Sequence, residues 1–94
     1  MIVKTMKLQQ ETMNLAKVTF VALAKPSAAS RYTVTAYPQG EGLQPTLEVS
    51  SSRLHTWLRS LGNQDEADDV AASCEVCIRS LSTVDLKELG FQPR

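Results

Sequence analysis

Two cysteines three residues apart, Cys74 and Cys77, are the residues whose type and spacing most suggest a chemical site. In thioredoxin-like enzymes such a pair opens a helix that follows a strand, and the helix dipole activates one thiol. Here the pair falls inside a predicted helix, on its apolar side and after an acidic run. We therefore expect both cysteines to be buried and to pack as small apolar side chains.

Zinc binding is another interpretation of the cysteine pair, because cysteine and histidine are the ligands that structural zinc sites use. Four ligands are needed, and the chain has two cysteines and one histidine, His55. A carboxylate or a second chain would have to supply the fourth. We therefore predict no metal and no cofactor, and we expect His55 to be a partly exposed residue on the rim of a helix.

Other catalytic patterns are absent from the sequence. The acidic run at residues 65–69 lacks the central glycine and the ligand alternation of a calcium loop, and carboxylates are favourable at the start of a helix. The chain has no GxSxG motif for a serine nucleophile. It also has neither GxxxxGK[ST] nor GxGxxG for a phosphate. We predict that the protein is not an enzyme.

The candidate binding residues lie on two predicted strands, on the face opposite to the apolar one. They combine positive charge, hydroxyl groups and one aromatic ring: Lys17, Arg31, Thr33, Thr35 and Tyr37. This composition suits the rim of a protein interface. The two edges of a three-stranded sheet also invite an added strand from another protein or from a second copy of the chain.

These features favour a small non-catalytic accessory protein (an adaptor, regulator or inhibitor, of bacterial or mobile-element type) that docks on a partner protein. A homodimer is one form that such docking can take. The alternative is a small nucleic-acid-binding regulator that uses the same basic face of the sheet, because sheets followed by helices recur in RNA-binding modules. The net charge of zero gives this alternative less support than a basic domain would.

Charge is distributed unevenly along the chain. Residues 1–47 carry five basic and two acidic side chains, whereas residues 48–94 carry five basic and eight acidic ones. No stretch reaches the roughly 18 apolar residues that span a bilayer, and Lys17 interrupts the best signal-like segment, residues 13–24. We expect a cytoplasmic protein without membrane contact.

The candidate residues must be positioned by strands, which period-two alternation predicts at residues 17–23, 31–37 and 46–49. Their inward side chains are Val18, Phe20, Ala22, Tyr32, Val34, Ala36, Leu47 and Val49. We expect Pro26 to end the first strand, because proline donates no bond to a ladder. Short connections predict an antiparallel meander.

Helical spacing begins after the third strand. The first predicted helix follows the serines 50–52 and ends at Gly62, with Leu54, Trp57, Leu58 and Leu61 on its apolar side. The second runs from about Asn63 to Leu81, with Ala67, Val70, Ala71, Cys74, Cys77, Ile78 and Leu81 on one side. A short third helix covers residues 84–89, with Ser82 and Asp85 forming its cap.

The predicted fold is α+β: a three-stranded antiparallel meander packed against two or three C-terminal helices, in the order β-β-β-α-α. The 94 residues fit one domain, which we place at residues 16–94. Residues 1–15 match a helix and a strand equally and form an unassigned N-terminal segment. Five aromatic residues in the chain predict a mostly aliphatic core.

Overall fold

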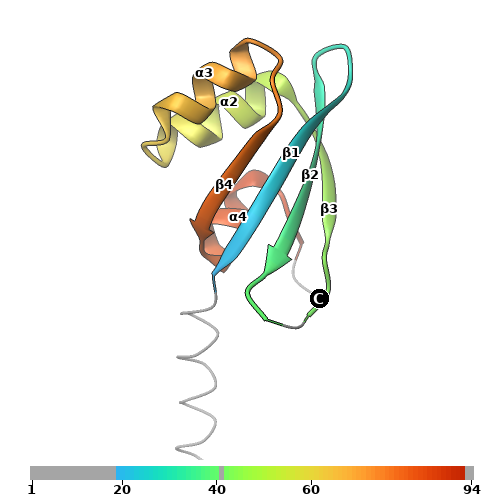
Figure 1. Cartoon of the computed structure of the whole chain (residues 1–94), viewed down its shortest axis with the longest axis vertical. Coiled ribbons are helices and arrows are strands. Elements are labelled where there is room, and N and C mark those ends of the chain that lie inside the picture. Colours follow the sequence, from blue (N-terminus) through green and yellow to red (C-terminus); the bar gives the residue numbers. More distant parts are fainter. Residues whose placement is uncertain (1–18, 41, 93–94) are drawn as a thin grey trace, which may run out of the picture.

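A computed structural model describes residues 19–40 and 42–92 (Figure 1). Its elements are β1 (Phe20–Ala28), β2 (Arg31–Pro38), β3 (Thr46–Ser50), α2 (Ser51–Ser60), α3 (Gln64–Ala71), β4 (Val76–Leu81) and α4 (Thr83–Leu89). The strands form one antiparallel sheet in the order β3-β2-β1-β4. The α+β class is confirmed, but a fourth strand interrupts the helices. The unassigned segment 1–15 lies outside the described residues.

The sheet has two different faces. The inner face carries the alternating side chains Tyr32, Val34 and Ala36 of β2, each at most 1% exposed, as the sequence predicted. The helices pack on this face through Leu54, Trp57, Leu58, Ala67, Val70, Leu86 and Leu89. In Figure 1 the sheet lies in front and α4 lies behind it. We call the opposite side the outer face.

β1 is longer than predicted, because it continues through Pro26 to Ala28. The Gln39 N–H bond to the Thr19 carbonyl (3.0 Å) sets the ladder phase, so that even-numbered residues of β1 direct their backbone toward β4. Pairing with β4 ends at Ala24. The backbone nitrogen of Pro26 faces the side of β1 on which β4 no longer pairs, so the N–H that proline lacks is not needed for the ladder.

The first and last helices form as predicted. The Ser50 side chain caps α2, and Gly62 (φ +83°) ends it, with the Asn63 N–H bonded to the Leu58 carbonyl. Ser82 and Asp85 form a reciprocal capping box at α4. Two side chains join these helices: Arg53 Nε donates to the Leu89 carbonyl and Trp57 Nε1 to the Asp85 carbonyl, both at 2.8 Å.

The second helix is much shorter than predicted: α3 ends at Ala71 instead of near Leu81. Ser73 adopts a left-handed conformation (φ +63°), and its N–H bonds to the Val70 carbonyl. The Cys74 N–H bonds to the Asp69 carbonyl at 2.8 Å. These two bonds form the same helix-ending motif as at Gly62, with serine where glycine is usual.

The segment after this turn is β4, so the helical interpretation of residues 74–81 is wrong. Val76 and Ile78 alternate with Cys77 and are 4% and 1% exposed. β-Branched side chains at alternate positions fit a sheet as well as the helical spacing did. Cys74 and Cys77, predicted to be buried, are both exposed, and Val76, which was not among the predicted inward residues, is in the core.

Tyr32 connects β2 to the junction between α3 and β4. Its hydroxyl donates to the Cys74 carbonyl at 2.7 Å, and the ring is 1% exposed. Burial raises the pKa of the Tyr32 hydroxyl above its ordinary value, and the nearby Cys74 and Asp69 raise it further. The β1–β4 ladder ends at Ala24 and Val76, so the Cys74 carbonyl lies outside it, and the Tyr32 hydroxyl satisfies this carbonyl.

No helix within residues 19–40 and 42–92 has the length and apolar character needed to cross a bilayer.

Replacing Ser73 by glycine should stabilise the protein by about 0.5–1 kcal/mol, because glycine adopts the left-handed conformation without steric cost. Urea unfolding of the wild type and of Ser73→Gly would measure the difference. Ser52→Gly, which lies inside α2, is the matched control and should destabilise by a similar amount. Equal destabilisation by both changes would contradict the helix end described at Ser73.

Replacing Tyr32 by phenylalanine should lower the free energy of unfolding by about 1–2 kcal/mol at neutral pH, because the Cys74 carbonyl loses its donor. The raised pKa of Tyr32 means that the unfolded chain releases the phenolic proton first as the pH rises. The wild type should therefore lose stability above about pH 10, while Tyr32→Phe lacks this loss. Urea unfolding between pH 7 and 11 would measure the difference in free energy of unfolding between the two proteins, which should become smaller as the pH rises. A difference that stays constant over this range would contradict a raised pKa of Tyr32 in the folded protein.

Candidate functional site

Four of the five predicted binding residues lie together on the outer face of β2. Arg31, Thr33, Thr35 and Tyr37 alternate with the buried residues of this strand and are half-buried or exposed. Lys17, the fifth, lies outside the described residues. No helix of the described chain packs on this face; the helices pack on the inner one. The structure therefore places the four residues on one open surface.

The sheet register adds residues that the sequence analysis did not select. On β1, Val21 lies opposite Tyr37, and Leu23 lies between Thr35 on β2 and Cys77 on β4. The alternation of Val21 and Leu23 with the inward alanines was a usable signal. Cys77 could not be found in this way, because its strand was taken for a helix.

These residues give the outer face an apolar strip, which we define as Val21, Leu23, Tyr37 and Cys77. Val21 and Tyr37 form a cross-strand pair at 38% and 37% exposure, Leu23 is half-buried, and Cys77 is exposed. The other large apolar side chains that are exposed in the described chain are separate, Leu43 in a loop and Val84 on α4. The strip is therefore the place where exposed apolar side chains adjoin one another.

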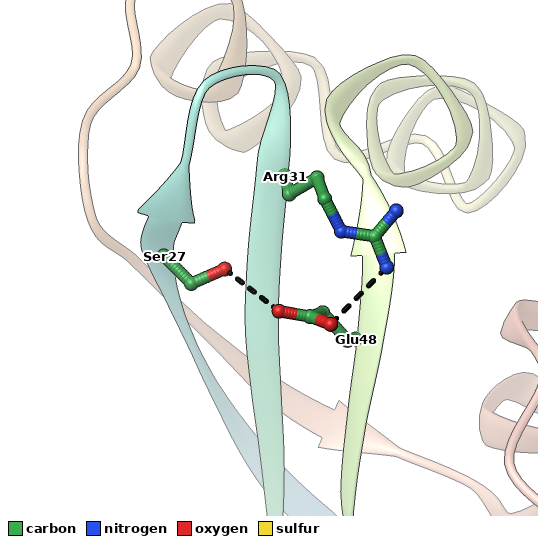
Figure 2. Close-up of polar contacts among 3 residues, drawn as sticks. All are labelled: Ser27, Arg31 and Glu48. Carbon is green, nitrogen blue, oxygen red and sulfur yellow. Dashed lines mark hydrogen bonds and ion pairs between the residues drawn. The ribbon is translucent and has the colours of Figure 1, made fainter.

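The charged part of the outer face includes one ion pair, shown in Figure 2. Arg31 Nη2 lies 3.2 Å from Glu48 Oε1, and the Ser27 hydroxyl donates to Glu48 Oε2 at 3.3 Å. Both charged side chains are about half exposed, at 48% and 53%, so the pair contributes at most about 1 kcal/mol. Its main effect is that Glu48 neutralises Arg31, one of the predicted basic residues.

A shallow hollow of about 330 Å³ opens at the end of the apolar strip. Its lining combines the Val21–Tyr37 pair with polar groups and a cation: Thr19, Val21, Tyr37, Pro38, Gln39, Arg79 and Ser80. The Thr19 hydroxyl donates to the Gln39 side-chain carbonyl and closes one wall. The hollow can receive a side chain that is apolar along its length and polar or anionic at its end.

Another hollow, of about 460 Å³, lies beside the start of α2 and is lined by Ser30, Ser51, Ser52, His55, Thr56, Val70, Ala71 and Ser73. His55 is half-buried at the rim of its helix, as predicted. In the described part of the chain, no three His, Cys, Asp or Glu side chains are placed to hold a metal ion. This hollow is polar and has no apolar strip beside it.

The two cysteines do not form a joint site. Neither is in a disulfide. Cys74 lies in the junction after α3, where its Sγ contacts the Ala72 carbonyl at 3.8 Å, whereas Cys77 lies on the outer face beside Leu23. Cys77 is therefore part of the apolar strip and Cys74 is not.

Comparison of the chain with protein-family models, with curated proteins and with solved structures gives no match.

Both thiols should react in the folded protein, because both side chains are exposed. Titration with Ellman's reagent should give two thiols per chain without denaturant, and Cys74→Ser and Cys77→Ser should each give one. Each serine variant should change the free energy of unfolding by no more than about 0.5 kcal/mol. Reaction that requires denaturant would contradict the exposed positions.

Proposed function

We propose that this protein is a non-catalytic accessory protein that docks on a partner protein through its outer face. The observation that carries the proposal is the apolar strip, in which Val21 and Tyr37 lie side by side on a face that the described helices leave open. Apolar and aromatic side chains surrounded by polar ones match the core and rim of a protein interface.

The position of the strip in the sheet adds to this support. β1 and β2 are the two inner strands, and Val21 and Tyr37 lie opposite each other in the β1–β2 ladder, which is continuous from Phe20 to Pro26. A rigid surface loses little conformational freedom when it binds, and more of the contact energy then appears as affinity. Around the strip, Thr33, Thr35 and Lys25 supply polar rim groups.

Nucleic-acid binding, the alternative from the sequence, receives less support from this surface. Glu48 adds a negative charge beside Arg31, and Tyr37 is the one aromatic ring on the described outer face. Single-strand binding uses several stacking rings in a basic groove, and duplex binding uses many phosphate contacts. An experiment on partner binding must therefore distinguish nucleic-acid binding from protein binding.

Loss of the apolar strip should remove partner binding. The double variant Val21→Thr/Tyr37→Thr places β-branched threonine, which suits a strand, at both positions but removes exposed apolar area worth about 2 kcal/mol. Leu43→Thr/Val84→Thr is the matched control, because it changes the two exposed apolar residues outside the strip. We expect partner affinity to fall at least tenfold in the first variant and to stay unchanged in the control.

Each variant is immobilised and exposed to nuclease-treated source-cell lysate at 0.5 M salt, and quantitative mass spectrometry measures the proteins that it retains. The affinity of each retained partner for each variant is then measured by titration. Slower alkylation of Cys77, but not of Cys74, in the complex than in the free protein at the same concentration would locate the contact on the outer face. Equal retention by both double variants would contradict the proposal. Binding that nuclease or salt abolishes would favour the nucleic-acid alternative.

A further inference from the structure

We infer that β4, an edge strand of the sheet in the described part of the chain, pairs through its outer edge with the same edge of a second copy and forms a two-fold homodimer. The segment Glu75-Val76-Cys77-Ile78-Arg79 is complementary to itself when two copies run antiparallel. With Cys77 on the two-fold axis, Glu75 of each copy lies opposite Arg79 of the other. This edge interface adjoins the apolar strip, with which it shares Cys77, and adds to the proposed function.

The backbone of β4 is available for such a pairing. β4 is an edge strand of the described sheet, and its Val76 and Ile78 lie opposite Ala24 and Ala22 of β1. The ladder phase set by the Thr19–Gln39 bond directs the backbone of these two residues toward β1. Cys77, between them, therefore directs its N–H and C=O groups toward the other edge of β4, where an antiparallel copy can bond to them.

The side chains match as well as the backbone. Glu75, Cys77 and Arg79 are all exposed, whereas Val76 and Ile78 are buried on the inner face. In an antiparallel pair, residues on one face meet residues on the same face of the neighbour. Two copies thus form two cross-strand Glu75–Arg79 ion pairs on either side of a Cys77–Cys77 contact.

Charge selects this arrangement. Within residues 19–40 and 42–92 the recorded ion pair is Arg31–Glu48, and neither Glu75 nor Arg79 takes part in it. A parallel pairing would place like charges together, which destabilises a sheet. At the other edge of the sheet, Glu48 of β3 already pairs with Arg31. β3 therefore has no acidic and basic residue placed to meet each other in an antiparallel second copy.

The length of the contact is limited. Ser80 has φ +62°, and the β1–β4 register shifts between Ala22–Ile78 and Phe20–Leu81, so the regular part of β4 ends after Ile78 in a bulge at Arg79 and Ser80. Such a short edge gives a small interface, and small interfaces associate weakly. We therefore expect a reversible dimer whose population depends on protein concentration, with the two outer faces side by side in one continuous sheet.

Sedimentation velocity of the full chain over a range of concentrations tests the inference. Glu75→Arg and Arg79→Glu each turn two attractive pairs into two repulsive ones, so each should raise the dissociation constant of the dimer about tenfold or more. The double variant Glu75→Arg/Arg79→Glu restores opposite charges and should recover the wild-type constant. Arg59→Glu, an exposed change on α2, is the control and should have no effect.

Thiol cross-linking locates the interface independently. A short bis-maleimide should link two chains through Cys77, so that Cys74→Ser cross-links and Cys77→Ser does not. A wild type that stays monomeric at millimolar concentration would overturn the inference, as would a dimer whose constant ignores both single charge reversals. A dimer lost in Val21→Thr/Tyr37→Thr but insensitive to the charge reversals would instead assign self-association to the apolar strip.

Discussion

The bond from the Tyr32 hydroxyl to the Cys74 carbonyl lies at the point on which the rest of the sheet depends. It joins β2 to the turn where α3 ends, and it satisfies a carbonyl that lies beyond the end of the β1–β4 ladder. After this turn, Val76 and Ile78 pack against β1 in the core. β4 thereby covers what would otherwise be the edge of β1, and its apolar side chains pack beside Ala22 and Ala24.

The helix ends explain both where the sequence was sufficient and where it was not. α2 and α3 end in the same motif, with a left-handed residue followed by a residue whose N–H reaches back to the helix. At α2 that residue is Gly62, which signals a helix end in the sequence. At α3 it is Ser73, which does not. All three non-glycine residues of positive φ in the described chain are serines: Ser30, Ser73 and Ser80.

The segment after Ser73 then fits two periods at once. Val70, Ile78 and Leu81 keep helical spacing, whereas Val76 and Ile78 keep the spacing of a strand, and both patterns place apolar residues inward. Tertiary pairing with β1 decides between them, and it is a contact between residues more than fifty positions apart. Where the period was unambiguous, in β2, β3, α2 and α4, the predicted strands, helices and inward residues agree with the structure.

This single ambiguity also changes the candidate site. In a helix, Cys77 would have joined the core; in β4 it lies on the outer face beside Leu23 and completes the apolar strip. Arg31, Thr33, Thr35 and Tyr37 could be placed on one face because their alternation lies within one strand. The Val21–Tyr37 pair needs the β1–β2 register, and Arg79 needs β4 itself.

The same alternation couples the stability of the fold to association at its edge. The inward residues of β4 hold the strand to β1, and its outward backbone groups remain for a partner. A strand added to this edge would bind β4 only while β4 is in the sheet, so it would stabilise the junction at Ser73 and Cys74 by mass action. Conversely, a change that weakens that junction would weaken association without touching the interface. The turn between α3 and β4 therefore affects both the stability of the core and the strength of association at the β4 edge.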